Sequence, residues 1–382
     1  MCWLQRVSEM RILSNIKNRQ KGAGRMKKAL IAMSGGVDSS TAAFLAIEQG
    51  YSCIGCTMKL YEPVRADIPD DAGCCAPDES ADARKVADAL GIPHGTFDLS
   101  ELFSEKVIRK FCDSYRAGKT PNPCIECNRC LKFGALLDCA DKLGCEKIVT
   151  GHYARIEETD SGYVLKKAAD PAKDQSYVLH MLTQAQLSRV LLPLGGLSKP
   201  QVRAVAEQQG FVNAHKKESQ DICFVPDGDY ARIIRQITGE EPVPGDFVDT
   251  EGRFLGHHEG LIHYTVGQRR GLGIAIGKPA YVCGLDPEHN RVIIGSNEDL
   301  FRRSCTVFGV NWISGTPPQG SLRCRAKIRY RHPEQPAVIE FTDNDTVLLT
   351  FDAPQRAITP GQSAVFYDGD IVLGGGEITR VP

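Results

Sequence analysis

The stretch Lys28-Ala-Leu-Ile-Ala-Met-Ser-Gly-Gly-Val-Asp-Ser-Ser40 predicts how the first part of the chain folds. Its apolar run at residues 30–33 is typical of a buried parallel strand. Gly35 and Gly36 allow a tight turn whose N–H groups can converge on an anion. Residues 39–50 have the pattern of a helix, and a helix N-terminus favours negative charge. The stretch therefore predicts a strand, a turn and a helix around an anion site.

The glycine spacing of this turn excludes two common phosphate-binding motifs. No Gly-Lys-Ser/Thr follows, so it is not a Walker loop, and the dinucleotide fingerprint needs other glycine positions. The run from Ser34 to Ser40 instead resembles the PP-loop of ATP pyrophosphatases. That resemblance implies a domain that holds ATP and adenylates a substrate.

Length and composition place the chain among ordinary globular proteins. With 382 residues, two or three domains are expected. The formal net charge of −1 means that any surface for nucleic acid must be local. No apolar stretch approaches a membrane-spanning length, and residues 1–26 lack the apolar core of a secretory signal. Fifteen cysteines then favour reduced thiols, metal binding or catalysis in the cytoplasm over a disulfide scaffold.

Strand and helix patterns alternate through the first half of the chain, which predicts a parallel sheet covered by helices. Strands are expected at residues 53–58, 94–97 and 148–150. Helices are expected at 79–90, from an N-cap at Ser100 onward, and at 133–143. Residues 62–77 are expected to form a loop that carries Cys74 and Cys75. Two prolines before Cys124 exclude a helix ahead of it. A hairpin at 155–167 and a helix with a capping box at 198–201 follow.

From residue 243 onward glycine and proline are frequent and apolar runs are short, which is typical of β domains. The predicted fold class is α/β: a parallel-sheet PP-loop domain of the adenine nucleotide alpha hydrolase type, a small central linker domain and a C-terminal antiparallel β-barrel. The predicted boundaries are 1–26 for a disordered extension, 27–211 for the ATP-binding catalytic domain, 212–280 for the central linker domain and 281–382 for the barrel.

Four cysteines are candidates for thiol chemistry. Cys124, Cys127 and Cys130 have the spacing C-x-x-C-x-x-C at a loop-to-helix junction, where thiols can converge on a metal and where the helix dipole favours thiolate. The proline-rich loop is expected to expose Cys124 and Cys127, while Cys130 lies inside the helix. Cys223 follows two lysines in a polar run, which would lower its pKa and makes it a candidate second thiol.

Five basic residues alternate with apolar ones between residues 322 and 331. On a strand, the basic residues would share one face. Like charges in a row repel, so a phosphate backbone is the better explanation for this face than simple solvation. The basic residues are Arg323, Arg325, Lys327, Arg329 and Arg331. Arg269 and Arg270 add a basic loop that is equally consistent with a solvated turn.

Five separated motifs together resemble the MnmA (TrmU) family of tRNA-uridine 2-sulfurtransferases over residues 28–382. They are the run from Ser34 to Ser40, Asn122-Pro123 with Cys127, Gly151-His-Tyr-Ala154, Lys173-Asp-Gln-Ser176 and Asp221-Ile-Cys-Phe224. The resemblance implies ATP-dependent adenylation of the wobble uridine of tRNA, then sulfur transfer to give 2-thiouridine with release of AMP and pyrophosphate.

The resemblance also implies roles for individual residues. Cys127 would be the nucleophile, and Cys223 would carry a persulfide. ATP would be held by Ala32, Met33, Ser34, Gly35, Gly36, Val37, Asp38, Ser39, Met58 and Gly151. The target base and tRNA would meet Asn122, Pro123, Cys124, His152, Lys173, Asp174, Gln175 and Gln362, and the central linker domain would bind tRNA. Arg329 and Tyr330, from the basic stretch at 322–331, are further candidate tRNA contacts. Mg²⁺ would neutralise the phosphates, with Asp38 as a ligand directly or through water.

Cys124 departs from the family pattern, because many members carry aspartate there. This raises the alternative of an iron–sulfur cluster held by Cys124, Cys127 and Cys223. The sulfur would otherwise come as persulfide or sulfide from a donor protein. Two other functions stay open: a PP-loop ligase or amidotransferase acting on a small molecule, and a non-catalytic RNA-binding protein.

Overall fold

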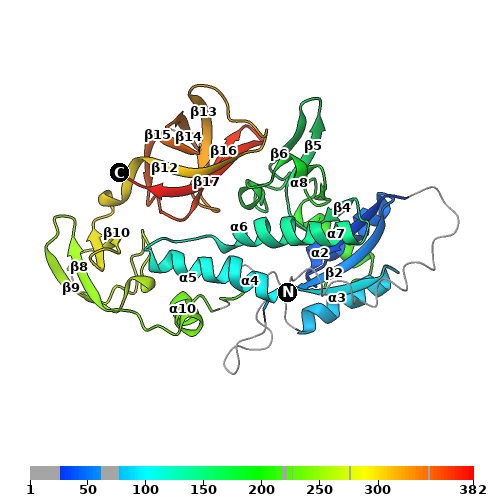
Figure 1. The fold of residues 1–382 in the computed structure, drawn as a ribbon, viewed down its shortest axis with the longest axis horizontal. Helices are drawn as coiled ribbons and strands as arrows, with labels where there is room; N and C mark the ends of the chain where they lie inside the picture. The colour runs from blue at the N-terminus through cyan, green and yellow to red at the C-terminus, as the bar shows by residue number, and fades with distance from the viewer. Residues whose placement is uncertain (1–25, 62–76, 217–221, 226, 275–276, 343–344) are drawn as a thin grey trace. The chain divides into compact units, whose positions relative to one another are not determined.

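The computed structural model describes residues 26–61, 77–216, 222–225, 227–274, 277–342 and 345–382 (Figure 1). Two compact units divide the chain, one of Met1–Lys106 with Glu126–Pro226 and one of Val107–Ile125 with Asp227–Pro382. The predicted extension before Met26, the loop with Cys74 and Cys75, and residues 217–221 lie outside the described residues.

The first unit contains a parallel sheet with the strand order β3-β2-β1-β4-β7. Each neighbouring pair in this order is parallel, which confirms the predicted sheet. Its strands are β1 (Lys28–Ala32), β2 (Ser52–Lys59), β3 (His94–Asp98), β4 (Lys147–Val149) and β7 (Val190–Leu191). The hairpin of β5 (Arg155–Thr159) and β6 (Gly162–Lys166) is also confirmed.

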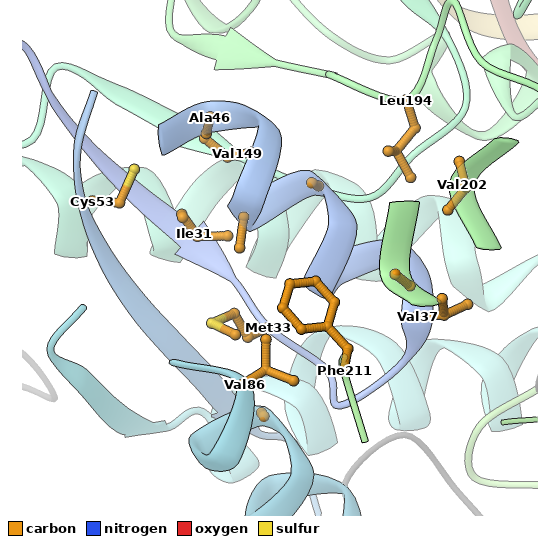
Figure 2. Close-up of a cluster of buried hydrophobic side chains, with 14 of the residues drawn as sticks. Ile31, Met33, Val37, Ala46, Cys53, Val86, Val149, Leu194, Val202 and Phe211 are labelled. Atoms are coloured by element: carbon orange, nitrogen blue, oxygen red, sulfur yellow. The ribbon is translucent and has the colours of Figure 1, made fainter. Parts of the chain in front are cut away.

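Helices α2 (Val37–Glu48), α3 (Pro77–Ala89) and α9 (Lys199–Gln208) of the first unit bury a common apolar core with the sheet. The unit also contains α7 (Leu136–Lys142), α8 (Gln184–Leu187) and the short 3₁₀ turn η4 (Ser176–Leu179). Figure 2 shows members of this core, among them Ile31 and Val149 from the sheet, Val37 of α2, Val86 of α3 and Val202 of α9. This core fixes the end of β1 and the start of α2 relative to each other.

Two long helices contain π-helical segments. One runs through α4 (Ser100–Phe103), η2 (Ser104–Ile108) and α5 (Arg109–Arg116), and the other through α6 (Pro123–Cys127), η3 (Asn128–Ala135) and α7. A π-helical segment inside an α-helix frequently marks a functional region.

The helix starts differ from three predictions. Helix α2 begins at Val37 rather than at residue 39. Ser100 is not an N-cap, because Asp98 Oδ1 accepts its N–H at 3.0 Å and Ser100 is the first helical residue. Helix α6 begins at Pro123, ahead of Cys124, because a proline is tolerated in the first turn, where its missing N–H costs nothing.

The second unit joins helices to a four-stranded sheet of order β10-β11-β8-β9. The strands are β8 (Gly245–Asp249), β9 (Phe254–His258), β10 (Tyr281–Asp286) and β11 (Arg291–Gly295), with the short turns η5 (Leu261–His263) and η6 (Glu298–Leu300). Tyr230 of α10 (Tyr230–Thr238) stacks on Tyr115 of α5 with ring centroids 5.7 Å apart. This aromatic contact ties α5 to the second unit.

The C-terminal strands form a closed antiparallel barrel, as predicted. The order is β12-β15-β14-β13-β16-β17, and pairing of β12 with β17 closes it. The strands are β12 (Phe301–Trp312), β13 (Leu322–Lys327), β14 (Gln335–Phe341), β15 (Thr346–Arg356), β16 (Ser363–Asp368) and β17 (Ile371–Arg380). Strand β13 ends at Lys327, so the predicted strand through residue 331 is too long. The predicted fold class is confirmed, while the domain boundaries stay a prediction.

Candidate functional site: a glycine loop and two thiols

Residues 33–36, called the glycine loop below, connect β1 to α2. Gly35 has a φ of 76°, a left-handed conformation that glycine adopts without steric cost. Gly36 is the N-cap of α2, and because glycine has no side chain it does not cap the first N–H groups of the helix. Such N–H groups are donors for an anion, and the helix dipole adds attraction. The geometry is that of a phosphate site.

Serine hydroxyls hold the carbonyl side of the loop. Ser39 Oγ accepts the Ser34 N–H at 3.2 Å and donates to Gly36 O at 3.0 Å. Ser40 Oγ donates to the same carbonyl at 3.1 Å. Because the Gly36 carbonyl is bound by α2 itself, the loop is restrained before any ligand arrives. Pre-organised donors cost little reorganisation when charge develops.

Asp38, in the first turn of α2, has two partners from distant parts of the chain. Lys199 Nζ lies 2.7 and 2.9 Å from its two carboxylate oxygens. Tyr153 Oη donates to Asp38 Oδ1 at 2.7 Å. Only 10% of the Lys199 side chain is exposed. A largely buried ammonium group, that of Lys199, therefore lies beside the glycine loop. No motif in the sequence indicated this position.

The predicted capping box of α9 explains why Lys199 lies there. Ser198 is the N-cap, its N–H donates to Gln201 Oε1 at 2.8 Å, and a proline occupies the first turn. Lys199 is thus held at the start of a helix that packs against α2. The sequence signal for the helix start was correct, but it gave no indication that Lys199 contacts Asp38.

The two strands that flank β1 bring further residues that were predicted to bind ATP to the same edge of the sheet. Met58 lies near the end of β2, and Gly151 follows β4. A Cβ atom on Gly151 would lie 2.9 Å from both Asp38 C and Ser39 N, closer than real Cβ contacts. Gly151 is therefore required for the approach of this segment to α2. The carboxyl edge of a parallel sheet is the usual ligand position in such folds.

Helix α6 carries two of the candidate thiols. Asn122 Oδ1 accepts the Cys124 N–H at 3.1 Å, as a capping side chain does. Cys124 is exposed, as predicted, whereas Cys127 is buried, with 8% exposure. The prediction of an exposed Cys127 is wrong because α6 continues into η3, so Cys127 lies inside a long helix. Cys130, in η3, is half-buried.

Aromatic contacts position the segment that carries Cys223. Tyr61 Oη donates to Cys223 O at 2.8 Å. Phe224 packs edge-on against Phe103 with ring centroids 5.7 Å apart, and Tyr61 stacks on Phe103 at 6.2 Å. Cys223 itself is half-buried. Two lysines were expected near Cys223. Lys216, the one that lies within the described residues, has its Nζ 3.3 Å from Asp82 Oδ2.

Burial raises the pKa of eight other thiols. The pKa is about 11 for Cys112, Cys139, Cys145 and Cys283, about 12 for Cys53, Cys305 and Cys324, and well above its usual value for Cys56. In each case desolvation of the thiolate is the largest cause. Since the thiolate is the nucleophile, these cysteines are unsuited to sulfur chemistry.

His152 is buried beside helix η3. Its Nδ1 lies 2.8 Å from Thr150 Oγ1, and its ring is 5.7 Å from that of Phe133. Burial, and to a lesser extent the Lys132 charge, hold the pKa of His152 well below its usual value. His152 is therefore neutral at physiological pH and can exchange hydrogen bonds without carrying charge.

Two of the residues predicted to contact tRNA have internal hydrogen bonds. Asp174 is buried, and Oδ1 accepts the N–H groups of Ala168 and Ser176 at 3.0 and 3.1 Å. Gln175 Oε1 accepts the Tyr153 N–H at 2.9 Å, which places the tyrosine that bonds Asp38. Both side chains shape the loop that presents Lys173. Their contact with tRNA stays a prediction.

In the second unit, Gln362 lies beside the segment that precedes Asn122. Gln362 Nε2 donates to Thr120 O at 2.7 Å, and the Thr120 N–H donates to Pro360 O at 2.9 Å. The structure thus brings Gln362 close in space to the Asn122, Pro123 and Cys124 segment, although about 240 residues separate them.

The basic residues of β13 and the following turn are largely engaged within the second unit. Arg323 pairs with Asp352, and Arg325 Nη2 donates to Glu334 O at 2.8 Å. Arg329 donates to Val266 O and Ala357 O at 3.0 and 2.9 Å, and to Thr359 Oγ1. Tyr330 follows with 36% exposure. Arg323, Arg325 and Arg329 therefore have internal partners, while contact of this row of charges with a phosphate backbone stays a prediction.

Two features are absent from the part of the chain that the structure describes. No group of three or more His, Cys, Asp or Glu side chains there could hold a metal ion. None of the helices in the described ranges has both the length and the apolar character needed to cross a bilayer.

Three domain families match successive parts of the chain. Residues 27–227 match the tRNA methyl transferase HUP domain, residues 232–296 the tRNA methyl transferase PRC-barrel domain, and residues 302–378 the aminomethyltransferase beta-barrel domain. The first match alone spans more than half of the chain.

Curated relatives are similar over nearly their whole length. A tRNA-specific 2-thiouridylase of Caldanaerobacter subterraneus is 49% identical over 92% of this chain and 98% of its own. That of Acetivibrio thermocellus is 48% identical over 92% and 99%, and that of Clostridioides difficile 47% over 93% and 98%. A solved 4-thiouridine synthetase–RNA complex with bound ATP aligns at 18% identity and a TM-score of 0.36, over 56% of this chain and 50% of that one. The curated relatives confirm the family predicted from the five motifs.

Proposed function

The chain belongs to the family of tRNA-specific 2-thiouridylases, and on that premise we propose that it converts the wobble uridine of tRNA to 2-thiouridine. The reaction uses ATP to activate the uridine oxygen and a thiol-borne sulfur to replace it. AMP and pyrophosphate are the other products. We place this reaction in the cytoplasm, where thiols stay reduced.

The observation that carries this proposal is the glycine loop with its buried cation. The N-cap Gly36 has no side chain to cap the N–H groups at the start of α2, and Lys199 supplies positive charge within 3 Å of Asp38. Such a site suits a triphosphate that must lose pyrophosphate. ATP would lie along residues 32–39, Met58 and Gly151, at the carboxyl edge of the sheet.

In the activation step, the uridine oxygen attacks the α-phosphorus of ATP and pyrophosphate leaves. Lys199 and the loop N–H groups stabilise the charge that moves onto the leaving phosphates. Bound Mg²⁺ would neutralise phosphate charge, but Asp38 already accepts hydrogen bonds from Lys199 and Tyr153. Direct ligation by Asp38 therefore fits poorly, and contact through water is the better proposal.

In the sulfur step, Cys223 carries a persulfide received from a donor protein. Cys127 attacks the Cys223 sulfur, so a Cys127–Cys223 disulfide forms and the terminal sulfur leaves as hydrosulfide. Hydrosulfide attacks the activated ring carbon, and AMP leaves with the former uridine oxygen. A two-electron reductant then restores both thiols.

An iron–sulfur cluster at Cys124, Cys127 and Cys223 is the alternative sulfur carrier. The described residues contain no three-ligand group for a metal, and Cys124 is exposed while Cys127 is buried. We therefore propose the persulfide route and derive no step through a cluster.

The proposed tRNA contacts come from both units. In the first unit they are His152 and the loop of Lys173, Asp174 and Gln175. In the second they are Asn122, Pro123 and Cys124, where the helix α6 begins, with Gln362, Arg329 and Tyr330. Arg329 and Tyr330 have the weakest support, because the Arg329 guanidinium already binds carbonyl groups of its own unit.

The decisive experiment incubates the protein with ATP, a persulfide donor and unmodified tRNA, and measures both pyrophosphate and 2-thiouridine. We expect Cys127→Ala and Cys223→Ala to release pyrophosphate but to form no 2-thiouridine. The matched control is Cys283→Ala, a thiol whose pKa burial raises to about 11, which should thiolate normally.

Four outcomes would contradict parts of this proposal. Pyrophosphate release that needs no tRNA would favour a small-molecule ligase, and its absence under all conditions would favour a binding protein. Full thiolation by Cys223→Ala would remove the proposed carrier. Iron and activity lost together in Cys124→Ala, after anaerobic purification, would favour the cluster.

A further inference from the structure

Asn213 contacts the glycine loop from a segment that the sequence analysis did not select. The residue is 1% exposed. Its Nδ2 donates to Gly35 O at 2.9 Å and to Ser40 Oγ at 2.8 Å. Both hydrogens of the amide are therefore used on the loop and on the first turns of α2.

Hydrogen-bond chemistry fixes the orientation of this amide. Gly35 O can only accept, so the atom that faces it must be the nitrogen. Ser40 Oγ donates to Gly36 O, so it can accept from Asn213. Asn213 thus restrains two successive loop carbonyls, Gly35 directly and Gly36 through Ser40.

The oxygen of the Asn213 amide lowers the stability of the folded protein. Its Oδ1 is buried and has no hydrogen-bond partner within the described part of the chain. A buried acceptor without a donor is destabilising, so a small apolar side chain would suit the interior better. Local violations of this kind are expected where a residue serves a functional site.

We propose that Asn213 is a positioning residue for the nucleotide. It holds the carbonyls of Gly35 and Gly36, so that the N–H groups of the same two peptide units, which point the opposite way, turn toward the phosphates of ATP. The inference rests on the proposed use of ATP at this loop. Asn213 does not itself touch the reacting atoms.

The segment that carries Asn213 is itself anchored. Arg203 Nη1 donates to Ala214 O at 2.8 Å, and Nη2 donates to Lys216 O at 3.3 Å. Because Arg203 belongs to α9, the same helix positions Lys199 beside Asp38 and Asn213 beside Gly35. Anchoring of the chain directly after Asn213 gives the asparagine a fixed position from which to restrain the loop.

The test compares three substitutions at this position by direct ATP binding, tRNA-dependent pyrophosphate release and thermal unfolding. We expect Asn213→Ala to weaken ATP binding and to raise the KM for ATP by about tenfold, because two hydrogen bonds to the loop are lost. Asn213→Asp should be worse, because a carboxylate cannot donate and repels phosphate. Asn213→Ser, which keeps one donor, should fall between wild type and Asn213→Ala.

The matched control is Thr41→Val. Thr41 is buried on α2 and donates to Val202 O at 3.4 Å, away from the loop. Thr41→Val should lower the unfolding temperature at least as much as Asn213→Ala does, and its KM for ATP should stay unchanged. Loss of thermal stability with unchanged ATP affinity in Asn213→Ala and Asn213→Ser would overturn the proposal. Direct ATP binding separates this failure from that of the proposed function, because it requires no turnover.

Discussion

The glycine loop and the basic residues around β13 were both conspicuous in the sequence, and they differ in what holds them. In the loop, backbone groups form the site, and the local run of Gly, Asp and Ser determines where they point. Around β13, side-chain charges were the signal, and their meaning depends on partners such as Asp352 and Glu334 that the pattern does not contain. A motif that acts through the backbone can be recognised locally, whereas a row of charges cannot be interpreted without its neighbours.

The largest effect should come from removing the cation of the loop. Lys199→Met keeps the length of the side chain but leaves Asp38 with Tyr153 as its remaining partner among those described above. We expect tRNA-dependent pyrophosphate release to fall at least about a hundredfold, since removing one pre-organised charge or donor commonly costs that much. tRNA affinity in a filter-binding assay should stay near the wild-type value.

The control for this prediction is Lys166→Met. Lys166 pairs with Glu157 across the hairpin of the same unit and lies away from the loop. It should change neither reaction nor binding. An equal loss of tRNA affinity in folded Lys199→Met protein would break the distinction between a nucleotide site and a tRNA surface.

Several parts of the site could be predicted from the sequence because they depend on local backbone contacts. The strand, the loop and the capping box at Ser198 depend on contacts within a few residues, and each was predicted correctly. Lys199 and Asn213 were missed because they reach the loop from 161 and 178 residues away. Cys127 was misjudged because its burial depends on how the whole helix packs rather than on the prolines before it.

Arg329 should act on stability more than on tRNA. Its guanidinium binds Val266 O, Ala357 O and Thr359 Oγ1, so Arg329→Met removes the donor to Val266 O, while Ala357 O still accepts from the Thr359 hydroxyl. We expect the free energy of unfolding to fall by about 1–3 kcal/mol, as when a buried acceptor loses its donor. Urea unfolding measures this change. A flatter salt dependence of tRNA binding with unchanged stability would instead make Arg329 a phosphate contact.

His152 should make the stability of the first unit depend on pH. Burial holds its pKa well below the usual value of about 6.5. Below that pH the unfolded chain binds a proton that the folded protein does not, so the free energy of unfolding falls as the pH falls. This decrease in the free energy of unfolding begins near pH 6.5, and its slope reaches up to about 1.4 kcal/mol per pH unit.

The measurement is urea unfolding between pH 7.5 and 5.5. His152→Gln should show a flatter profile than the wild type. Lys132→Met should flatten it only slightly, because the Lys132 charge is the smaller cause of the low pKa. An identical slope in His152→Gln would mean that other histidines whose pKa is lowered by burial, half-buried His94 and buried His258, dominate.

The smallest effect concerns the exposed pair of Arg323 and Asp352, and it sharpens the comparison most. Their side chains are 63% and 44% exposed, so Arg323→Gln should change the free energy of unfolding by less than about 1 kcal/mol. If the basic face of β13 contacts tRNA, Asp352→Asn should release Arg323 for a phosphate and steepen the log–log salt dependence of binding by up to about one unit. Arg323→Gln should then reverse that gain in the double variant. Identical salt slopes in wild type, Asp352→Asn and the double variant would mean that this face is compensated within the barrel and does not face tRNA.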